Sequence, residues 1–163
     1  MQKKTINSVL FICMGNICRS PAAHAVMEQV NREQALSWNI DSCGTCAYHQ
    51  GAAPDSRMQK VLHHHGYQGF RHAAKLFQTG MAYEFDLLLA MDLHNYDDIY
   101  ELLSHDADLS GKLHLFRDFD PEVSEGQRAE VPDPYYNGAK SFEEVYRMIV
   151  RTCTNLAAQF GAQ

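Results

Sequence analysis

The sequence lacks both a long apolar run and an excess of basic residues. No apolar stretch approaches the roughly 18 residues of a membrane-spanning helix, so no such span is expected. Fourteen Lys and Arg residues stand against twenty Asp and Glu residues, and the 163-residue chain carries a formal net charge of −6. Nucleic-acid binding usually requires a basic face that neutralises many phosphates. The composition therefore argues against membrane insertion and against broad nucleic-acid binding.

The sequence also lacks the even number of cysteines that a disulfide framework needs. It contains five cysteines, which cannot all pair with one another. Lys3, Lys4 and the apolar run from Val9 to Met14 imitate the start of a secretion signal. Asn16 and Arg19 interrupt this imitation, and the apolar run is short. We therefore expect a protein of the reducing cytoplasm.

The length and the 45% of apolar residues are typical of one globular domain, which we place at residues 1–163. Short apolar runs predict strands at Ser8–Cys13, Trp38–Cys43, Phe85–Met91 and Leu113–Phe116. Helical spacing of apolar residues predicts helices from Pro21, from Asp55 to a stop at Gly66, from Leu93 to Leu103 and from Phe142 to Phe160. Such alternation predicts a three-layer α/β fold, with a four-stranded parallel sheet and helices on both faces.

Parallel sheets bind ligands beyond the carboxyl ends of their strands, so the turn after the first strand is the first place to look for chemistry. There Cys13 ends a strand, and Arg19 and Ser20 lead into a helix that Pro21 starts, with Ser20 as a plausible N-cap. Backbone N–H groups at a helix N-terminus form an anion site. The phosphate-binding residues expected in this loop are Met14, Gly15, Asn16, Ile17, Cys18, Arg19 and Ser20.

Two residues of this loop carry the predicted chemistry. Arg19 offers a planar fork that can bind two phosphate oxygens. The same positive surroundings favour the thiolate form of Cys13, which is the nucleophilic form. The loop lacks the glycine and lysine pattern of ATP-binding loops.

The segment from Val9 to Pro21 resembles the signature of the low-molecular-weight protein tyrosine phosphatases. Further segments resemble landmarks of the same family in the same order, at Asp41–Thr45, Pro54–Arg57, Met91–Asn95 and Asp133–Tyr136. The resemblance covers nearly the whole chain, and the cysteine loop is its most specific motif.

The resemblance implies hydrolysis of protein phosphotyrosine through a phosphocysteine. The phenolate of tyrosine leaves poorly without a proton, because the pKa of the phenol is about 10. In the family an aspartic acid at the position of Asp133 supplies that proton while Cys13 attacks phosphorus, and it then activates the water that hydrolyses the intermediate. Arg19 and the loop N–H groups would stabilise the equatorial oxygens. No cofactor and no metal ion are expected.

The resemblance also implies a set of residues that support the loop. Asn16, Ser42 and His72 match a network that holds the loop in shape. Ser20 would donate its hydroxyl to the Cys13 thiolate, besides or instead of capping the helix. Cys18 would form a reversible disulfide with Cys13 that protects the nucleophile from further oxidation.

Three tyrosines, Tyr48, Tyr135 and Tyr136, match positions that line the substrate pocket in the family. Aromatic walls can stack on a tyrosyl ring and set a depth that the shorter phosphoserine cannot span. The implied partner is a protein that carries phosphotyrosine, and a tyrosine kinase is one such candidate. We expect a monomer or a weak dimer.

Some residues depart from the family pattern. Cys43 and Cys46 form a C-x-x-C motif, but no second pair of ligands follows that would complete a zinc site. Three consecutive histidines, His63–His65, would point in different directions on a helix, and His24 stands where many relatives have Glu. We therefore predict no metal site at the C-x-x-C motif or at His63–His65, and we place Cys153 in the core.

Three alternative functions remain open at this point. An arsenate reductase of the same fold would need extra relay cysteines, and none lies between Cys46 and Cys153. Protein arginine phosphatases tend to carry Thr where Ile17 stands. A non-catalytic phosphotyrosine-binding module would need neither Cys13 nor Asp133.

Overall fold

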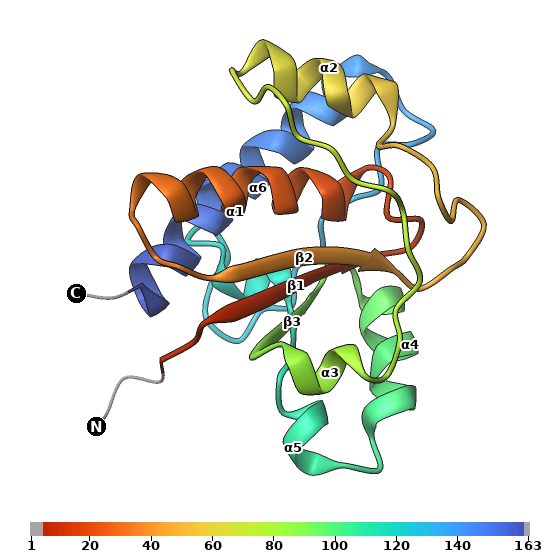
Figure 1. Ribbon diagram of the computed structural model, residues 1–163, viewed down its shortest axis with the longest axis vertical. Coiled ribbons are helices and arrows are strands. Elements are labelled where there is room, and N and C mark those ends of the chain that lie inside the picture. Colours follow the sequence, from red (N-terminus) through yellow and green to blue (C-terminus); the bar gives the residue numbers. More distant parts are fainter. Residues whose placement is uncertain (1–4, 162–163) are drawn as a thin grey trace.

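The structure, a computed structural model, describes residues 5–161 and contains a parallel sheet of four strands (Figure 1). The strand order is β2-β1-β3-β4. Every neighbouring pair is parallel. The strands are β1 (Ser8–Cys13), β2 (Asn39–Gly44), β3 (Leu87–Ala90) and β4 (Leu113–Leu115). The predicted parallel four-stranded sheet is confirmed.

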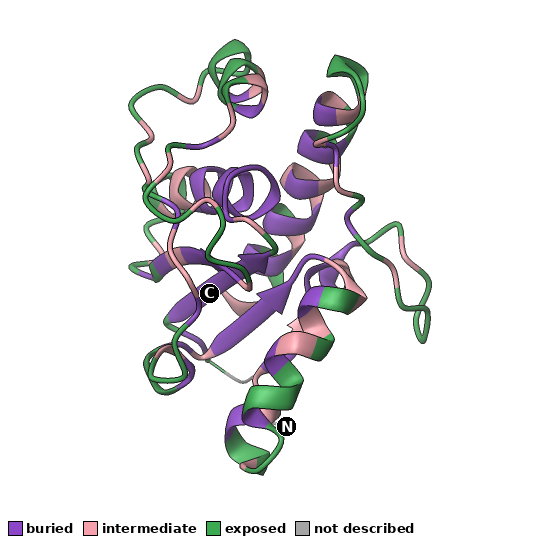
Figure 2. Ribbon diagram, turned by 90° about the vertical axis from the view of Figure 1, so that its right-hand side faces the viewer, coloured by how far each residue is buried: buried purple, intermediate pink, exposed green. Residues whose placement is uncertain are grey.

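Helices cover both faces of the sheet (Figure 1). One face carries α1 (Arg19–Glu33), α2 (Ser56–His64) and the long α6 (Ala139–Phe160), and the other carries α3 (Met81–Glu84), α4 (Leu93–Leu103) and α5 (Ala107–Ser110). A 3₁₀ turn, η1 (Phe116–Phe119), follows β4. Figure 2 shows the strands and the inward faces of the helices buried, with exposed residues on the outer turns. The predicted three-layer α/β class is therefore confirmed.

The alternation of side chains along β1 explains the two cores. Val9, Phe11 and Cys13 belong to the apolar cluster beneath α1 and α6, whereas Leu10 and Ile12 belong to the cluster beneath α4. Successive side chains of a strand point to opposite faces of the sheet. A strand covered on both faces is therefore buried at every position, and this is why Val9–Cys13 is an unbroken apolar run after the buried Ser8.

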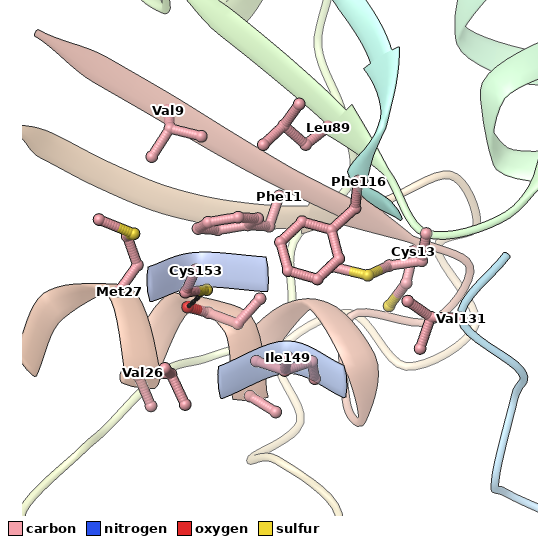
Figure 3. Packing of buried hydrophobic residues seen from close by; sticks show 14 of the residues in the cluster. Val9, Phe11, Cys13, Val26, Met27, Leu89, Phe116, Val131, Ile149 and Cys153 are labelled. Carbon is pink, nitrogen blue, oxygen red and sulfur yellow. Dashed lines mark hydrogen bonds between the residues drawn. The ribbon is translucent and has the colours of Figure 1, made fainter. Parts of the chain in front are cut away.

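The larger core brings β1 against the helices α1 and α6 (Figure 3). The rings of Phe11 and Phe116 meet edge to face, with centroids 5.6 Å apart. Cys153 of α6 is fully buried in this cluster, as predicted, and its thiol lies 3.9 Å from the Ala23 carbonyl oxygen. Cys13 and Val131 lie at one end of the same core. The packing thus fixes the position of Cys13 from within.

The predicted strand ends differ from the structure by one or two residues. β2 runs from Asn39 to Gly44, and β3 is shorter than the predicted Phe85–Met91. Phe85 and Met91 are nevertheless buried. The apolar run therefore marks the residues that are buried, and these extend beyond the residues that pair in the sheet.

The helix starts follow the sequence signals at α2 and α4, whereas α1 begins at Arg19, before the predicted Pro21, and α6 begins at Ala139, before the predicted Phe142. Asp55 caps α2 and Asp92 caps α4, each through its carboxylate. The predicted N-cap role of Ser20 is wrong, because α1 begins at Arg19 and has no side-chain cap. The Ser20 hydroxyl contacts Cys13 instead. Within residues 5–161, no helix is long and apolar enough to cross a membrane.

Candidate active site

The loop between β1 and α1 wraps around the Cys13 sulfur. The sulfur lies 2.9 Å from the Ser20 hydroxyl oxygen and accepts a hydrogen bond of 3.3 Å from the Asn16 backbone N–H. Asn16 makes this turn with a left-handed backbone, at a φ of 56°. Asparagine tolerates that conformation better than most residues. The loop therefore directs both hydrogen-bond donors and the N-terminal end of α1 towards one thiol.

Two glycines, Gly15 in this loop and Gly44 next to it, occupy positions where a side chain would collide with a neighbour. A Cβ at Gly15 would lie 2.9 Å from a ring carbon of His49. A Cβ at Gly44, at the end of β2, would lie 2.6 Å from the Met14 carbonyl oxygen. Gly15 has no positive φ, so within this loop the left-handed backbone occurs at Asn16.

Arg19 is the buried cation of the site and is only 3% exposed. One terminal nitrogen, Nη1, donates to the Asp92 carboxylate at 2.8 Å and to the Val131 carbonyl oxygen at 2.9 Å. The other terminal nitrogen, Nη2, lies 3.7 Å from the Asp133 carboxylate. Burial alone would lower the pKa of Arg19, but the charges of Cys13 and of the two carboxylates outweigh it and raise the pKa. The guanidinium is therefore charged and held in one orientation.

Asp133 reaches the site from the loop that precedes α6. Its side chain is 35% exposed, and its Oδ1 accepts a hydrogen bond of 3.0 Å from the Tyr135 backbone N–H. The Val131 backbone N–H donates to the Met91 carbonyl oxygen, which ties this loop to the end of β3. The hollow over Cys13 and Arg19 is lined by Asp133 as well. A carboxyl group thus faces the thiol across one hollow.

The aromatic walls of this hollow differ from the prediction at one position. Tyr135 and Tyr136 line it, but Tyr48 does not. Tyr48 is 85% exposed and lines an adjoining hollow. Its neighbour His49 occupies the place that the sequence assigned to Tyr48. The segment 47–50 is a turn, so adjacent side chains point in different directions and the family pattern could not select between them.

The three predicted supporting residues do meet one another. The Asn16 side-chain amide donates to the hydroxyl oxygens of Ser20 at 2.8 Å and Ser42 at 3.1 Å. The amide oxygen of Asn16 accepts from the Lys75 backbone N–H at 3.0 Å and from the Nε2 of His72 at 2.7 Å. Since a backbone N–H can only donate, it fixes which way the amide points. The strained turn at Asn16 is therefore held by a directed network.

His24 is an additional member of this network that the sequence did not assign to it. Its Nδ1 lies 3.0 Å from the Ser42 hydroxyl oxygen, and its Nε2 lies 3.1 Å from a Glu28 carboxylate oxygen. The carboxylate accepts the Nε2 proton, so Nδ1 accepts the Ser42 proton. Burial, and then the neighbouring His24, lower the pKa of His72 to about 4. A neutral His72 donates its Nε2 proton to Asn16.

The other four cysteines differ from Cys13 in exposure or in how readily the thiol loses its proton. All five are free thiols, and only Cys46 is exposed. Burial, followed by the charges of Asp55 and Cys13, raises the pKa of Cys18, which therefore stays a thiol. Cys18 lines the same hollow as Cys13. Cys43 and Cys46 are not bonded to each other.

The three consecutive histidines do not converge. His65 stacks on Tyr146, with ring centroids 4.1 Å apart, and contacts Glu143. His63 and His64 are exposed on α2 and line a separate surface hollow. The His64 ring meets the edge of the His65 ring, with centroids 5.2 Å apart, but only His65 reaches Tyr146 and Glu143.

Comparisons with known proteins agree with this geometry. A family model described as low molecular weight phosphotyrosine protein phosphatase matches residues 8–163. A low molecular weight protein-tyrosine-phosphatase of Streptomyces coelicolor is 40% identical over 157 residues, covering 95% of this chain and 94% of the relative. The low molecular weight phosphotyrosine protein phosphatase of Homo sapiens is 35% identical over 155 residues, covering 94% of this chain and 95% of the relative.

A solved structure has the same fold. The protein tyrosine phosphatase of Entamoeba histolytica superimposes with a TM-score of 0.82 at 40% identity, covering 93% of this chain and 94% of that chain. The family model matches residues 8–163, a range that includes the loop, Arg19 and Asp133. The chain therefore belongs to the low molecular weight phosphotyrosine protein phosphatase family.

Proposed function

We propose that the protein is a protein-tyrosine phosphatase that acts through a phosphocysteine on Cys13. The observation that carries this proposal is the hollow in which the Cys13 sulfur, the Arg19 guanidinium and the Asp133 carboxyl group meet. Substrates of the family are phosphoproteins. The whole chain would act as one catalytic domain.

The first half-reaction forms the intermediate. The Cys13 thiolate attacks phosphorus, and a sulfur–phosphorus bond forms as the bond from phosphorus to the tyrosyl oxygen breaks. Asp133 gives its proton to that departing oxygen. Arg19 and the N–H groups of the loop are placed to stabilise the charge on the equatorial oxygens. Asp92 and the Val131 carbonyl group keep Arg19 directed towards them.

The second half-reaction releases phosphate. Asp133, now a carboxylate, takes a proton from the water that attacks phosphorus, and the sulfur–phosphorus bond breaks. The thiolate that leaves is stabilised by the Ser20 hydroxyl at 2.9 Å and by the Asn16 backbone N–H. Because Asn16 donates to the Ser20 oxygen, the one Ser20 hydroxyl proton is left for the Cys13 sulfur at 2.9 Å or for the Cys43 carbonyl oxygen at 3.3 Å, and a thiolate is the stronger acceptor of the two.

The preference for phosphotyrosine would come from the aromatic wall. Tyr135, Tyr136 and His49 surround the entrance to the hollow, whereas Cys13 is buried at its base. A phosphoserine side chain is too short to bring its phosphorus to the sulfur from that rim. The Arg57 guanidinium donates to the Tyr135 carbonyl oxygen at 2.9 Å and lies over the Tyr135 ring, which holds this wall in place.

The proposal also includes a role for Cys18, a partner protein and a cellular location. Cys18, in the same hollow, would form the reversible disulfide with Cys13 that protects it from over-oxidation. A tyrosine kinase is the phosphoprotein partner we favour, and a monomer or weak dimer is the assembly. Five free thiols are consistent with a cytoplasmic location.

The test is phosphate release from a phosphotyrosyl peptide, with phosphoserine and phosphoarginine peptides alongside. We expect turnover of phosphotyrosine, no activity in Cys13→Ser, and a loss of about 10²-fold or more in Asp133→Asn. Exchange of the exposed carboxylate in Asp97→Asn is the matched control and leaves the rate unchanged.

Two outcomes would contradict the proposal. Binding of phosphotyrosine without turnover would make the loop a receptor. A preference for phosphoarginine would leave the mechanism in place and overturn the assignment of the substrate, for which Ile17 in the wall of the hollow is the residue to examine.

A further inference from the structure

A cluster of nitrogen and oxygen ligands lies behind the catalytic loop, outside the substrate hollow. His24 on α1, Asp41 on β2 and His72 on the segment after α2 each offer one ligand atom, and these atoms all lie within 4.8 Å of one another. The three residues are 17 and 31 positions apart in sequence, so only the fold unites them. We propose that this cluster binds one divalent transition-metal ion, with Zn²⁺ as the preferred ion.

The hydrogen bonds of His24 prepare it as a ligand. Its Nε2 faces the Glu28 carboxylate at 3.1 Å, and its Nδ1 faces Ser42 at 3.0 Å on the side of the cluster. Histidine ligands of metals usually donate their second ring N–H to a carboxylate, which fixes the tautomer and makes the other nitrogen more basic. The side chain is buried, at 6% exposure, so this orientation is held by packing.

The other two ligands come from residues that are already held in place. The His72 ring packs edge to face on the His24 ring, with centroids 5.2 Å apart. One carboxylate oxygen of Asp41 accepts from the Ser42 backbone N–H at 2.8 Å, and the other contacts the Lys75 ammonium group. Lys75 is 40% exposed, so its ammonium group can move to solvent when an ion arrives. A divalent ion would then replace one positive charge beside Asp41.

The donor set selects the kind of ion. Two imidazole nitrogens and one carboxylate oxygen match the three-ligand zinc site that keeps a fourth position for water. Mg²⁺ and Ca²⁺ prefer oxygen ligands throughout. Zinc bonds of about 2.0 to 2.2 Å place tetrahedral ligand atoms about 3.3 Å apart, so the cluster must contract on binding.

Binding would weaken the support of the catalytic loop. The lone pair of His24 Nδ1 that a metal ion would take is the one that accepts the Ser42 hydroxyl proton. Ser42 in turn accepts a hydrogen bond from Asn16, whose left-handed turn shapes the loop around Cys13. Zinc bound behind the loop would therefore lower turnover without entering the substrate hollow.

The binding test uses the full chain with Cys13→Ser and Cys46→Ser, because these changes remove the nucleophile and the only exposed thiol. ZnCl₂ is titrated calorimetrically, and circular dichroism checks the fold. We expect one equivalent of Zn²⁺, bound about tenfold or more weakly after His24→Gln. Glutamine can still accept from Ser42 and donate to Glu28, so this change removes the metal ligand and keeps the hydrogen bonds.

Two further variants keep the test decisive. Asp41→Asn, at a half-buried position, must weaken zinc binding as well, and it decides the matter if His24→Gln does not fold. His105→Gln repeats the same exchange at an exposed histidine beyond α4 and must leave binding unchanged. No binding to the parent protein, or equal binding by the parent, His24→Gln and Asp41→Asn, would overturn the proposal. Neither result depends on phosphatase activity.

The effect on turnover is measured separately, with Cys13 intact and Cys46→Ser. Zinc should slow phosphotyrosine hydrolysis in this protein, and His24→Gln should raise the zinc concentration needed for half inhibition about tenfold. Equal inhibition of both proteins would overturn the link between the cluster and the loop.

Discussion

Arg19 and Asp92 form a hydrogen-bonded ion pair of 2.8 Å between the first turn of α1 and the residue that caps α4. The two residues are 73 positions apart, and they meet because β1 and β3 are neighbours in the sheet. Asp92 uses one carboxylate oxygen for Arg19 and the other for the Asn95 backbone N–H. One side chain thus caps α4 and orients the guanidinium of the buried Arg19.

Asp92→Asn should separate these two tasks. Asparagine caps helices as well as aspartate does, so α4 should still form, and a fall in the melting temperature would report the lost counter-charge of the buried Arg19. The neutral amide weakens the charge-assisted hydrogen bond to Arg19, and we expect kcat/KM to fall about tenfold. Steady-state kinetics and thermal unfolding measure the two effects. Asp106→Asn, the same exchange at the cap of α5, is the control and should leave kcat/KM unchanged.

Ser20→Ala should slow release of the phosphate more than formation of the intermediate. The Ser20 hydroxyl lies 2.9 Å from the sulfur that leaves in the second step. Its loss also leaves one Asn16 amide hydrogen without its acceptor, which costs about 1–3 kcal/mol in a buried site. We expect a burst of tyrosyl product followed by a steady rate about tenfold lower, measured by stopped flow. A variant that slows without a burst would contradict this role.

Truncation of Tyr135 and truncation of Tyr48 should have different effects on kcat/KM. Tyr135 lines the hollow over Cys13, whereas Tyr48 lines the adjoining one. We expect Tyr135→Ala to lower kcat/KM for a phosphotyrosyl peptide by about 3–10-fold, the loss of one aromatic contact. Tyr48→Ala should change it by less than about twofold. Equal losses in both variants would restore the sequence-based assignment of Tyr48 to the pocket.

Asp120 should govern part of the stability in acid. Its side chain is buried and accepts hydrogen bonds from Arg117 at 2.8 Å and from Arg151 at 2.9 Å. Burial alone would raise its pKa, but the hydrogen bonds from Arg151, the Glu122 backbone N–H and Arg117 outweigh it and lower the pKa below its ordinary value. A pKa that is lower in the folded state adds stability above the unfolded-state pKa of about 3.9, and this stability is lost as the pH falls through the folded-state pKa.

The measurement is the free energy of unfolding by urea between pH 2 and pH 7. We expect Asp120→Asn to cost about 3 kcal/mol at neutral pH, because the two arginines lose their buried counter-charge. Below about pH 4, the free energy of unfolding should fall less steeply in the variant than in the parent protein, because the variant has no Asp120 carboxylate to protonate. Asp97→Asn, at an exposed position of α4, should keep the parent profile. A parent-like acid profile in Asp120→Asn would refute the assignment.

The local pattern of residues was sufficient for the four strands, for the helices α1, α2, α4 and α6 and for the identity of the loop, but it did not predict the short helices α3 and α5. An unbroken apolar run predicted β1, and the residues from Cys13 to Pro21 predicted an anion site at the start of a helix. Both are signals over a few residues, because strand burial and turn chemistry depend on near neighbours. The same local signal misled at Ser20, where a residue typical of a helix cap contacts the nucleophile instead.

The contacts that complete the site depended on the tertiary structure. The Val131 carbonyl group meets Arg19 across 112 positions, His49 rather than Tyr48 reaches the hollow, and His24 enters the network of Ser42. No local pattern carries these relationships, because they follow from the order of the strands and the directions of the connecting loops. The amino-acid sequence by itself determined which groups are available for catalysis. Only the packing of four strands against α1 and α6 decided which of them face the Cys13 sulfur.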